Sequence, residues 1–568
     1  MVESCFVPPS EVVELHLPDG RILRGARGAT LEELLRPLRT LWPSRIVGAI
    51  VNGELHELTY RVAIEARVRP IAMSDADGAR IYRRSLTFLL CTAFRRQFPG
   101  ATLRIHHTLS SGGYYCQVQD RAPLSAGELE GLRAEMRELV AQDLPFENRR
   151  VPVAEAMRLF EERGDADKVR LLRHRTRPLV DLYQVDGYVD YHHGYMVPST
   201  GYLEWFDLVA TNGGLALLYP RQHAPKQPTG LVHSPKLLAS FRQYGDWLHR
   251  LGIGDVGALV DAIKARRTRE IMLVSEALHE QHIAAIAQQI AERGEGARLV
   301  LISGPSSSGK TTFSRRLAVQ LLARGLSPFA LEMDSYFMER ERTPRDADGK
   351  FDFETIDALE LDQLGEHLGR LLEGREVQLP RYNFHLGRQE PGETVRLRPG
   401  QIVILEGIHG LNPRLVPPAL AAQAFKIYAS ALTQLNLDRH NRLSTTDTRL
   451  IRRIVRDARD RGYTATDTLA RWESVRRGEK LHIFPHQENA DVMFNSALVY
   501  ELAALRPLAE PLLRQVAHGS AEHVEAKRLL ALLQWFAPIE DSEVPENSIL
   551  REFLGGSSLK DFKVWGSG

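Results

Sequence analysis

The sequence predicts a multidomain α/β protein that contains a parallel β-sheet. Its 568 residues exceed the roughly 250–300 residues that a single core usually serves. An apolar run at 299–302 leads into a glycine-rich loop, and a helical pattern follows that loop. Strand and helix patterns then alternate from residue 298 onward. This alternation predicts parallel strands joined by right-handed crossovers, with a ligand at the carboxyl ends of the strands.

The glycine-rich loop matches the phosphate-binding pattern G-x-x-x-x-G-K-[S/T]. Its glycines allow backbone N–H groups to close around phosphate oxygens, and a lysine neutralises the β- and γ-phosphates. A hydroxyl after the lysine is suited to Mg²⁺. We therefore expect ATP and Mg²⁺ as cofactors, with Thr311 as one metal ligand. The predicted nucleotide-binding residues in the loop are Gly304, Ser306, Ser307, Ser308, Gly309, Lys310, Thr311 and Thr312.

Two acidic residues follow predicted strands near this loop. The segment 329–333 reads as a strand that ends at Asp334, and 402–405 reads as a buried strand that ends at Glu406. A carboxylate at the end of the first strand could accept the proton of a substrate hydroxyl. The second carboxylate is placed to assist the metal. Taken singly, each acid could also be a helix cap or a turn residue.

An arginine-rich helix is predicted at 449–461. On this helix Arg449, Arg452, Arg453 and Arg456 cluster. Planar guanidinium groups suit bidentate contacts with phosphate, so we expect these residues to close over the transferring group, with Arg449 and Arg453 assisting catalysis together with Asp334 and Lys310. A solvated basic face is the alternative.

Six motifs in this half resemble the uridine kinase and phosphoribulokinase-like family. They occur in the family's order over about residues 297–500, at Gly304–Thr312, Asp334–Phe337, Pro380–Phe384, Leu405–Ile408, Arg449–Gly462 and Ala490–Val492. The resemblance implies transfer of the γ-phosphoryl group to the 5′-hydroxyl of a nucleoside. It also implies Asp334 as the base, Glu406 as a metal residue and the arginines as phosphate ligands. The predicted acceptor contacts are Asp334, Tyr336, Tyr382, Phe384 and Arg388.

The acceptor side departs from the family pattern at two places. Phe353 and Glu354 stand where uridine kinases carry a histidine–proline pair, and Asn383 replaces an aspartate. A kinase of a phosphorylated sugar or another small alcohol is therefore an alternative. A nucleotide-gated RNA-binding regulator is a second alternative, from another class.

The N-terminal segment predicts a β-grasp domain. The pattern reads as a hairpin at 12–24, a helix opened by the capping box Thr30–Glu33 and a strand at 50–53. Four motifs, Leu17–Gly20, Gly28–Leu31, Val51–Gly53 and Asp75–Gly78, resemble the TGS domain of threonyl-tRNA synthetases. The resemblance implies contact with tRNA or RNA. A stabilising appendage is the alternative.

The next segment resembles the second additional domain of threonyl-tRNA synthetases, an α+β domain that hydrolyses mischarged tRNA around a His/Cys metal site. The motifs are Phe98–Gly100, Gly112–Tyr115 and Val197–Gly201. The four expected ligand positions hold Arg84, Phe88, His192 and Met196. An arginine and a phenylalanine cannot coordinate zinc. We expect the fold to remain and the hydrolytic site to be lost.

Composition sets the remaining expectations. The 73 basic and 72 acidic residues leave a net charge of +1, which predicts no general affinity for nucleic acid or an anionic membrane. Three cysteines and the lack of a long apolar run suggest a soluble cytoplasmic protein, and the kinase resemblance suggests a homo-oligomer. The predicted domains are 1–75 (TGS-like), 76–240 (synthetase-like), 241–295 (helical linker), 296–505 (phosphate-loop domain) and 506–568 (C-terminal helical tail).

Overall fold

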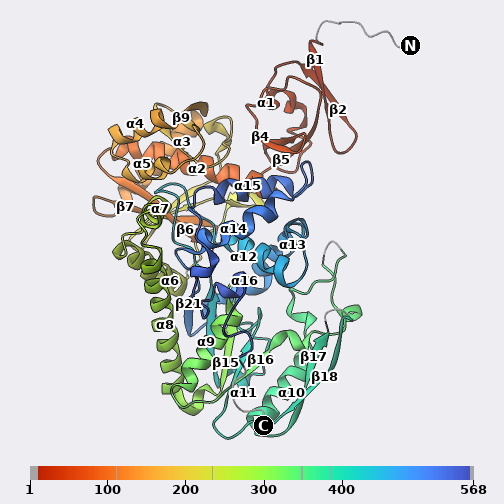
Figure 1. Ribbon diagram of the computed structural model, residues 1–568. Coiled ribbons are helices and arrows are strands. Elements are labelled where there is room, and N and C mark those ends of the chain that lie inside the picture. Colours follow the sequence, from red (N-terminus) through yellow and green to blue (C-terminus); the bar gives the residue numbers. More distant parts are fainter. Residues whose placement is uncertain (1–9, 111, 233, 347–348, 384–385, 563–568) are drawn as a thin grey trace.

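The computed structural model shows an elongated molecule with the N-terminal domains at one end and the parallel sheet at the other (Figure 1). It describes residues 10–110, 112–232, 234–346, 349–383 and 386–562. The C-terminal helices lie between the two ends of the molecule. No helix in these described ranges combines the length and the apolar character that crossing a membrane requires.

The first domain is a five-stranded mixed sheet in the order β2-β1-β5-β3-β4, with β1 parallel to β5. The predicted hairpin is present, and the Thr30 side chain accepts a hydrogen bond from the backbone N–H of Glu33, as the capping box predicts. The strand expected at 50–53 begins earlier, at Ile46. The elements are β1 (Val12–His16), β2 (Ile22–Ala26), α1 (Leu31–Leu34), β3 (Ile46–Val51), β4 (Glu54–Glu57) and β5 (Ala66–Ala72).

The second domain packs helices against two antiparallel sheets, in the orders β11-β12-β7-β6 and β10-β9-β8. Helix α2 (Ala76–Gln97) forms its centre, because its side chains are buried on several faces between Ile81 and Phe94. The other elements are β6 (Thr102–Leu109), β7 (Gly113–Gln119), α3 (Ala126–Ala141), β8 (Glu147–Pro152), α4 (Val153–Arg163), α5 (Ala166–Arg173), β9 (Leu179–Val185), β10 (Tyr188–Asp190), β11 (Asp207–Thr211), β12 (Gly214–Leu218), β13 (Pro220–Arg221) and β14 (Ala224–Pro228).

Three helices connect this domain to the parallel sheet: α6 (Pro235–Arg250), α7 (Val256–Lys264) and α8 (Thr268–Arg293). Helix α8 runs along the side of the molecule (Figure 1). Ile283, Ile286 and Ile290 pack in one core with the sheet, as their spacing predicts. Leu273 and Val274, on the same helix, are exposed.

The phosphate-loop domain has a fully parallel sheet in the order β16-β19-β15-β20-β21. Strands β15 and β19 are continuous apolar runs, as buried parallel strands usually are. The elements are β15 (Leu299–Ser303), α9 (Lys310–Leu322), β16 (Pro328–Glu332), α10 (Leu361–Leu372), β17 (Val377–Asn383), β18 (Arg388–Val395), β19 (Ile402–Glu406), α11 (Pro418–Ala421), β20 (Ala424–Ser430), α12 (Thr445–Asp460), α13 (Ala465–Gly478) and β21 (Val492–Asn495).

Helices α14 (Glu501–Arg514), α15 (His523–Leu533) and α16 (Arg551–Leu554) complete the chain. The predicted boundaries at 240–241 and 505–506 are wrong as structural divisions, because they fall inside α6 and α14. One hydrophobic core joins α4 and α5 of the second domain with α7, α12, α14 and α15. The regions that the sequence analysis assigned to separate domains therefore share one hydrophobic core.

Candidate functional site

The carboxyl ends of β16, β19 and β15 bring the predicted catalytic residues to one edge of the sheet. The three strands are neighbours in register, with Glu332 opposite Glu406 and Glu406 opposite Ile302. Asp334 therefore follows one outer strand, Glu406 ends the middle strand and the phosphate loop follows the third. This juxtaposition is the arrangement that the sequence predicted.

The backbone of the loop requires glycine at two positions. A Cβ at Gly304 would lie 1.9 Å from the carbonyl oxygen of Ala429, so any side chain there would displace the neighbouring strand. Gly309 has φ +84° and Ser307 has φ 57°, both in the left-handed region. Successive N–H groups turned in this way form a concave surface that is suited to an anion.

Lys310 and Thr311 begin helix α9 and face the loop. The Nζ of Lys310 donates a hydrogen bond to the carbonyl oxygen of Pro305 at 3.3 Å. The hydroxyl of Thr311 donates to the Glu406 carboxylate at 3.1 Å. Burial raises the pKa of Glu406 to about 7, with the Lys310 cation acting against that rise. A hydroxyl and a carboxylate oxygen at this separation are hard donors that fit Mg²⁺.

Asp334 lies in the short 3₁₀ turn Met333–Tyr336 directly after β16. Asp334 is exposed, whereas Met333 before it and Tyr336 two residues after it are buried. Burial by the surrounding protein raises the pKa of the Asp334 carboxyl, and the Lys310 cation opposes this rise. A carboxyl with a raised pKa and open access is suited to accept a hydroxyl proton.

The predicted acceptor contacts are only partly supported. Tyr336 is fully buried and its hydroxyl pairs with Nδ1 of His367, so the prediction that it contacts a substrate is wrong. Tyr382 is also buried, with its ring edge-on to Phe337 at 5.7 Å. Arg388 is exposed at the start of β18. Phe384 lies outside the described residues.

The first two arginines of α12 are buried and donate hydrogen bonds to backbone carbonyls of the phosphate loop. Arg449 and Arg452 are 1% and 0% exposed. Arg449 forms a two-pronged ion pair with Glu479 and donates to the carbonyl oxygen of Ser306 at 3.0 Å. Arg452 donates from Nε to Glu501 at 2.6 Å. Both guanidinium groups are already occupied by protein oxygens.

Arg453 and Arg456 lie on the same helix and are only partly buried. Arg453 donates to the hydroxyl of Ser306 at 2.8 Å, and Arg456 lies 3.8 Å from the carboxylate of Glu552. The alternative of a solvated basic face is wrong, because α12 is packed in the shared core through Leu450, Ile451 and Ile454. Asp457, on the same helix, pairs with both arginines, whereas the partners Glu479, Glu501 and Glu552 lie on later segments that the sequence pattern did not reveal.

The synthetase-like domain holds the substituted ligand positions in its interior. Arg84 donates to the carbonyl oxygen of Tyr195 at 2.7 Å. Phe88 is fully buried against Phe146, and Met196 is 1% exposed. At these three positions the structure therefore shows packing and a backbone contact in place of metal ligands.

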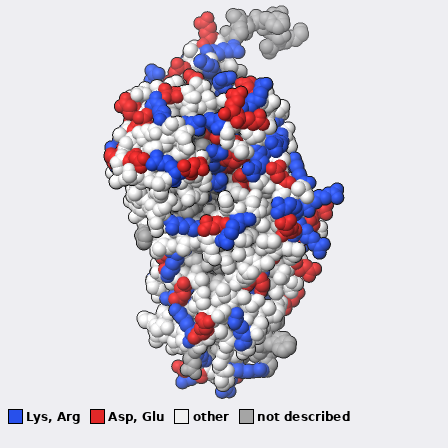
Figure 2. Space-filling view, turned by 90° about the vertical axis from the view of Figure 1, so that its left-hand side faces the viewer, with Lys and Arg blue, Asp and Glu red and all other residues white. Residues whose placement is uncertain are grey.

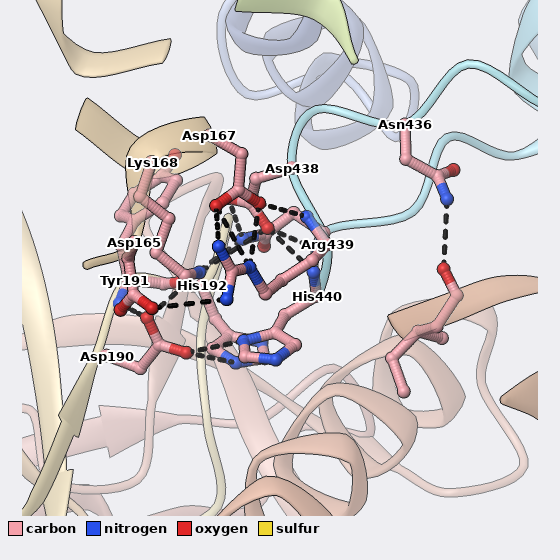
Figure 3. Close-up of polar contacts among 12 residues, drawn as sticks. Asp165, Asp167, Lys168, Asp190, Tyr191, His192, Asn436, Asp438, Arg439 and His440 are labelled. Carbon is pink, nitrogen blue, oxygen red and sulfur yellow. Dashed lines mark hydrogen bonds and ion pairs between the residues drawn. The ribbon is translucent and has the colours of Figure 1, made fainter. Parts of the chain in front are cut away.

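A segment of the phosphate-loop domain, residues 436–442, enters this domain (Figure 3). We call it the interdomain loop. Asn436 donates to the carbonyl oxygen of Ile105 at 3.0 Å, and Asn441 donates to that of Tyr191 at 3.0 Å. Arg439 donates from Nε to Asp167 at 2.9 Å. The loop ends two residues before α12 begins, so the second domain contacts the chain directly ahead of the arginine helix.

His192 lies close to two other residues that could ligate a metal, Asp190 and His440. Its Nε2 lies 3.8 Å from Asp190, and Nδ1 of His440, in the interdomain loop, donates to the same carboxylate at 2.8 Å. One ligand atom from each of these three residues lies within 4.8 Å of the others. However, the second oxygen of Asp190 lies 2.9 Å from Nζ of Lys168.

The charges around Asp190 are nearly balanced without a metal ion. Figure 3 shows the buried carboxylates of Asp165, Asp167, Asp190 and Asp438. Three cations pair with them: Arg163, Lys168 and Arg439. Adding a divalent ion would place it beside an ammonium group in the same buried network, which is electrostatically unfavourable.

Purified protein is therefore expected to contain far less than stoichiometric zinc and to lack deacylase activity. The measurements are metal analysis and hydrolysis of mischarged tRNA, with a threonyl-tRNA synthetase as the active control. Stoichiometric zinc that disappears in His192→Ala, together with deacylation, would contradict the expectation.

Comparison with known proteins finds similar sequences for the phosphate-loop domain and for the N-terminal half of the chain. Residues 299–503 match the model of the "Phosphoribulokinase / Uridine kinase family". The N-terminal half is similar to threonine–tRNA ligases. The ligase of Methylococcus capsulatus is 31% identical over 198 residues, which are 35% of this chain and 31% of the ligase. The ligase of Symbiobacterium thermophilum is 30% identical over 205 residues, which are 36% of this chain and 31% of the ligase.

Two solved structures show weaker similarity. A putative fructose transport system kinase from Silicibacter sp. is 19% identical, with a TM-score of 0.26, and covers 37% of this chain and 98% of its own. A possible uridine kinase from Bacillus stearothermophilus is 19% identical, with a TM-score of 0.27, and covers 38% of this chain and 98% of its own. Neither score is high enough to establish a shared fold.

The family match covers the strands, the phosphate loop and the arginine helix described above. The chain spans less than a third of the length of the ligases that it matches. Residues 299–503 thus match the phosphoribulokinase and uridine kinase family, and they follow an N-terminal half that is similar to part of the threonine–tRNA ligases.

Proposed function

We propose that this protein is an ATP- and Mg²⁺-dependent kinase that phosphorylates the 5′-hydroxyl of a nucleoside. The observation that carries the proposal is the meeting of the phosphate loop, Glu406 and Asp334 at one edge of a parallel sheet. Phosphoryl transfer depends mainly on positioning and on neutralising charge, and this edge supplies groups for both.

Each group has a distinct part in the proposed reaction. Lys310 and the loop N–H groups hold the phosphates, while Thr311 and Glu406 hold the magnesium ion, which neutralises charge on the phosphates when bound. Asp334 orients the acceptor hydroxyl and takes its proton. Arg453 and Arg456, the two less buried arginines, are the better candidates for phosphate contact. Arg449 and Arg452 fix the loop in place.

The acceptor side of the site differs from the pattern of uridine kinases. Glu354 stands where uridine kinases carry part of a histidine–proline pair, and burial raises the pKa of its carboxyl to about 7. A phosphorylated sugar or another small alcohol is therefore the second candidate. A panel of nucleosides, sugars and sugar phosphates with labelled ATP tests both: transfer to one nucleoside supports the proposal, and transfer only to a sugar or sugar phosphate overturns its acceptor.

The N-terminal half could make this protein a tRNA-responsive regulator. The interdomain loop occupies the synthetase-like domain through Arg439 and Asn441, and this observation favours a structural role instead. Kinase rates with and without tRNA distinguish the two roles. A change in rate at micromolar tRNA would favour the regulator.

A homo-oligomeric state remains a prediction, which sedimentation can test.

Binding of the metal–nucleotide complex is expected to release a proton from Glu406 in weakly acid solution. The pKa of its carboxyl is about 7, and a carboxylate must be ionised to bind Mg²⁺. Affinity should therefore fall as the pH drops from 8 to 6, by up to roughly tenfold per pH unit below the pKa. The number of protons released on binding can be measured by calorimetry in two buffers with different ionisation enthalpies. It should be larger by about one at pH 6 than at pH 8.

Glu406→Gln is the control for this measurement. The variant lacks the titrating carboxyl, so any proton that it still releases comes from the nucleotide or from other groups. Equal proton release by the wild type and the variant at pH 6 would contradict the assignment of Glu406.

A further inference from the structure

The C-terminal segment 545–554 reaches the phosphate loop. Helix α16 lies beside α12 and close to the start of α9 (Figure 1). The carboxylate of Glu552 accepts hydrogen bonds from both the backbone N–H and the hydroxyl of Thr312, each at 3.1 Å. Thr312 is a predicted nucleotide-binding residue in the first turn of α9.

Ile549, three residues earlier, covers the last glycine of the loop. It is fully buried, and its Cγ2 lies 2.5 Å from the position that a Cβ on Gly309 would take. Ile549 belongs to the same core as Phe313 and Phe494, so the segment is anchored by packing as well as by charge.

The arginine helix α12 also contacts the C-terminal segment, through Arg459 and Arg452. Arg459 donates to the carbonyl oxygens of Phe553 at 2.6 Å and Glu552 at 3.0 Å. The guanidinium group of Arg452 lies 5.0 Å from the centre of the Phe553 ring. Arg456 is close to the Glu552 carboxylate, as described above. The segment thus lies between α12 and the loop.

An anion at this position uses donors that a nucleotide would also use. The free N–H groups at the start of a helix attract negative charge, and a carboxylate and a phosphate oxygen accept the same hydrogen bonds. Both anions cannot occupy the Thr312 donors at once, and they would also repel each other. Nucleotide binding should therefore displace Glu552.

We propose that Glu552 is an internal substitute for a phosphate group, which occupies the donors of Thr312 and must leave them when a nucleotide binds. This inference rests on the proposed kinase function. Since an internal anion competes with the ligand, its removal should tighten nucleotide binding and should also loosen the C-terminal segment. Because Glu552 and a nucleotide phosphate compete for the donors of Thr312, the C-terminal segment would regulate nucleotide binding at the phosphate loop.

The test compares the wild type with Glu552→Gln, which keeps the size of the side chain and removes its charge. Calorimetry with the Mg²⁺ complex of β,γ-imido-ATP is expected to show affinity about 5- to 50-fold tighter in the variant. Glu546→Gln is the matched control, because Glu546 is exposed in the same segment. Its affinity should equal that of the wild type.

A second measurement needs no variant. Hydrogen exchange of the wild-type amides at 549–556 should become faster when the same complex binds. Unchanged or weaker affinity in Glu552→Gln, or slower exchange of this segment with nucleotide, would overturn the inference and leave the kinase proposal intact. Failure of the wild type and of Glu552→Gln to bind the complex would instead refute the proposed function.

Discussion

Replacing Lys310 with alanine is expected to abolish tight binding of Mg·ATP and to lower turnover by at least about 10³-fold. The lysine supplies the positive charge next to the β- and γ-phosphates, and the loop carbonyl of Pro305 is its only hydrogen-bond partner recorded among the described residues. Its loss should leave the fold intact, because the side chain serves the ligand more than the core. Calorimetry for binding and a coupled assay for turnover measure the two effects.

Lys226→Ala is the matched control, since Lys226 is exposed on β14, which belongs to the second domain and not to the parallel sheet. Its turnover and thermal midpoint should equal those of the wild type. If Lys310→Ala turns over ATP at the normal rate, the assignment of the loop is wrong. If its thermal midpoint falls sharply, the lysine is a structural residue.

The second large effect concerns Asp334. Asp334→Asn should keep nucleotide affinity and lower kcat by roughly 10²–10⁴-fold, the usual range for a positioned proton acceptor. Asparagine keeps the shape of the side chain but cannot take a proton at neutral pH. Measuring kcat separately from KM for the acceptor distinguishes a base from a binding residue.

Glu332→Gln provides the comparison for Asp334→Asn. Glu332 is exposed two residues earlier on β16 and contributes a negative charge to the same region. A large loss of kcat in Asp334→Asn alone supports proton transfer. Similar losses in both variants would point to a general effect of negative charge, and a change confined to KM would make Asp334 a binding residue.

The sequence predicted the phosphate loop and its two acidic partners because their determinants are local. A glycine-rich turn between a buried strand and a helix fixes its own geometry, and parallel strands bring their carboxyl ends together whatever the rest of the chain does. Tyr336 was misassigned for a related reason. It follows Asp334 closely, but the 3₁₀ turn points its ring into the core, and side-chain direction within such a turn is not visible in the sequence pattern.

The surroundings of the arginine helix were not predictable. Spacing showed that Arg449 and Arg452 lie near each other, but their partners Glu479 and Glu501 lie on later segments. Burial of an arginine depends on such distant partners, since an unpaired buried charge is costly. The interdomain loop is a similar case, because no local pattern indicates that Arg439 will meet Asp167.

The interdomain loop and the shared core also limit how the molecule can be divided. A fragment that starts at residue 296 would leave Arg439 and Asp438 without the oppositely charged side chains of Asp167 and Lys168. It would also remove the side chains of α4, α5 and α7 from the core that they share with α12, α14 and α15. Such a fragment should aggregate although it carries every residue that we propose to be catalytic. The N-terminal half would then be required for the phosphate-loop domain to fold, whether or not it binds a ligand of its own.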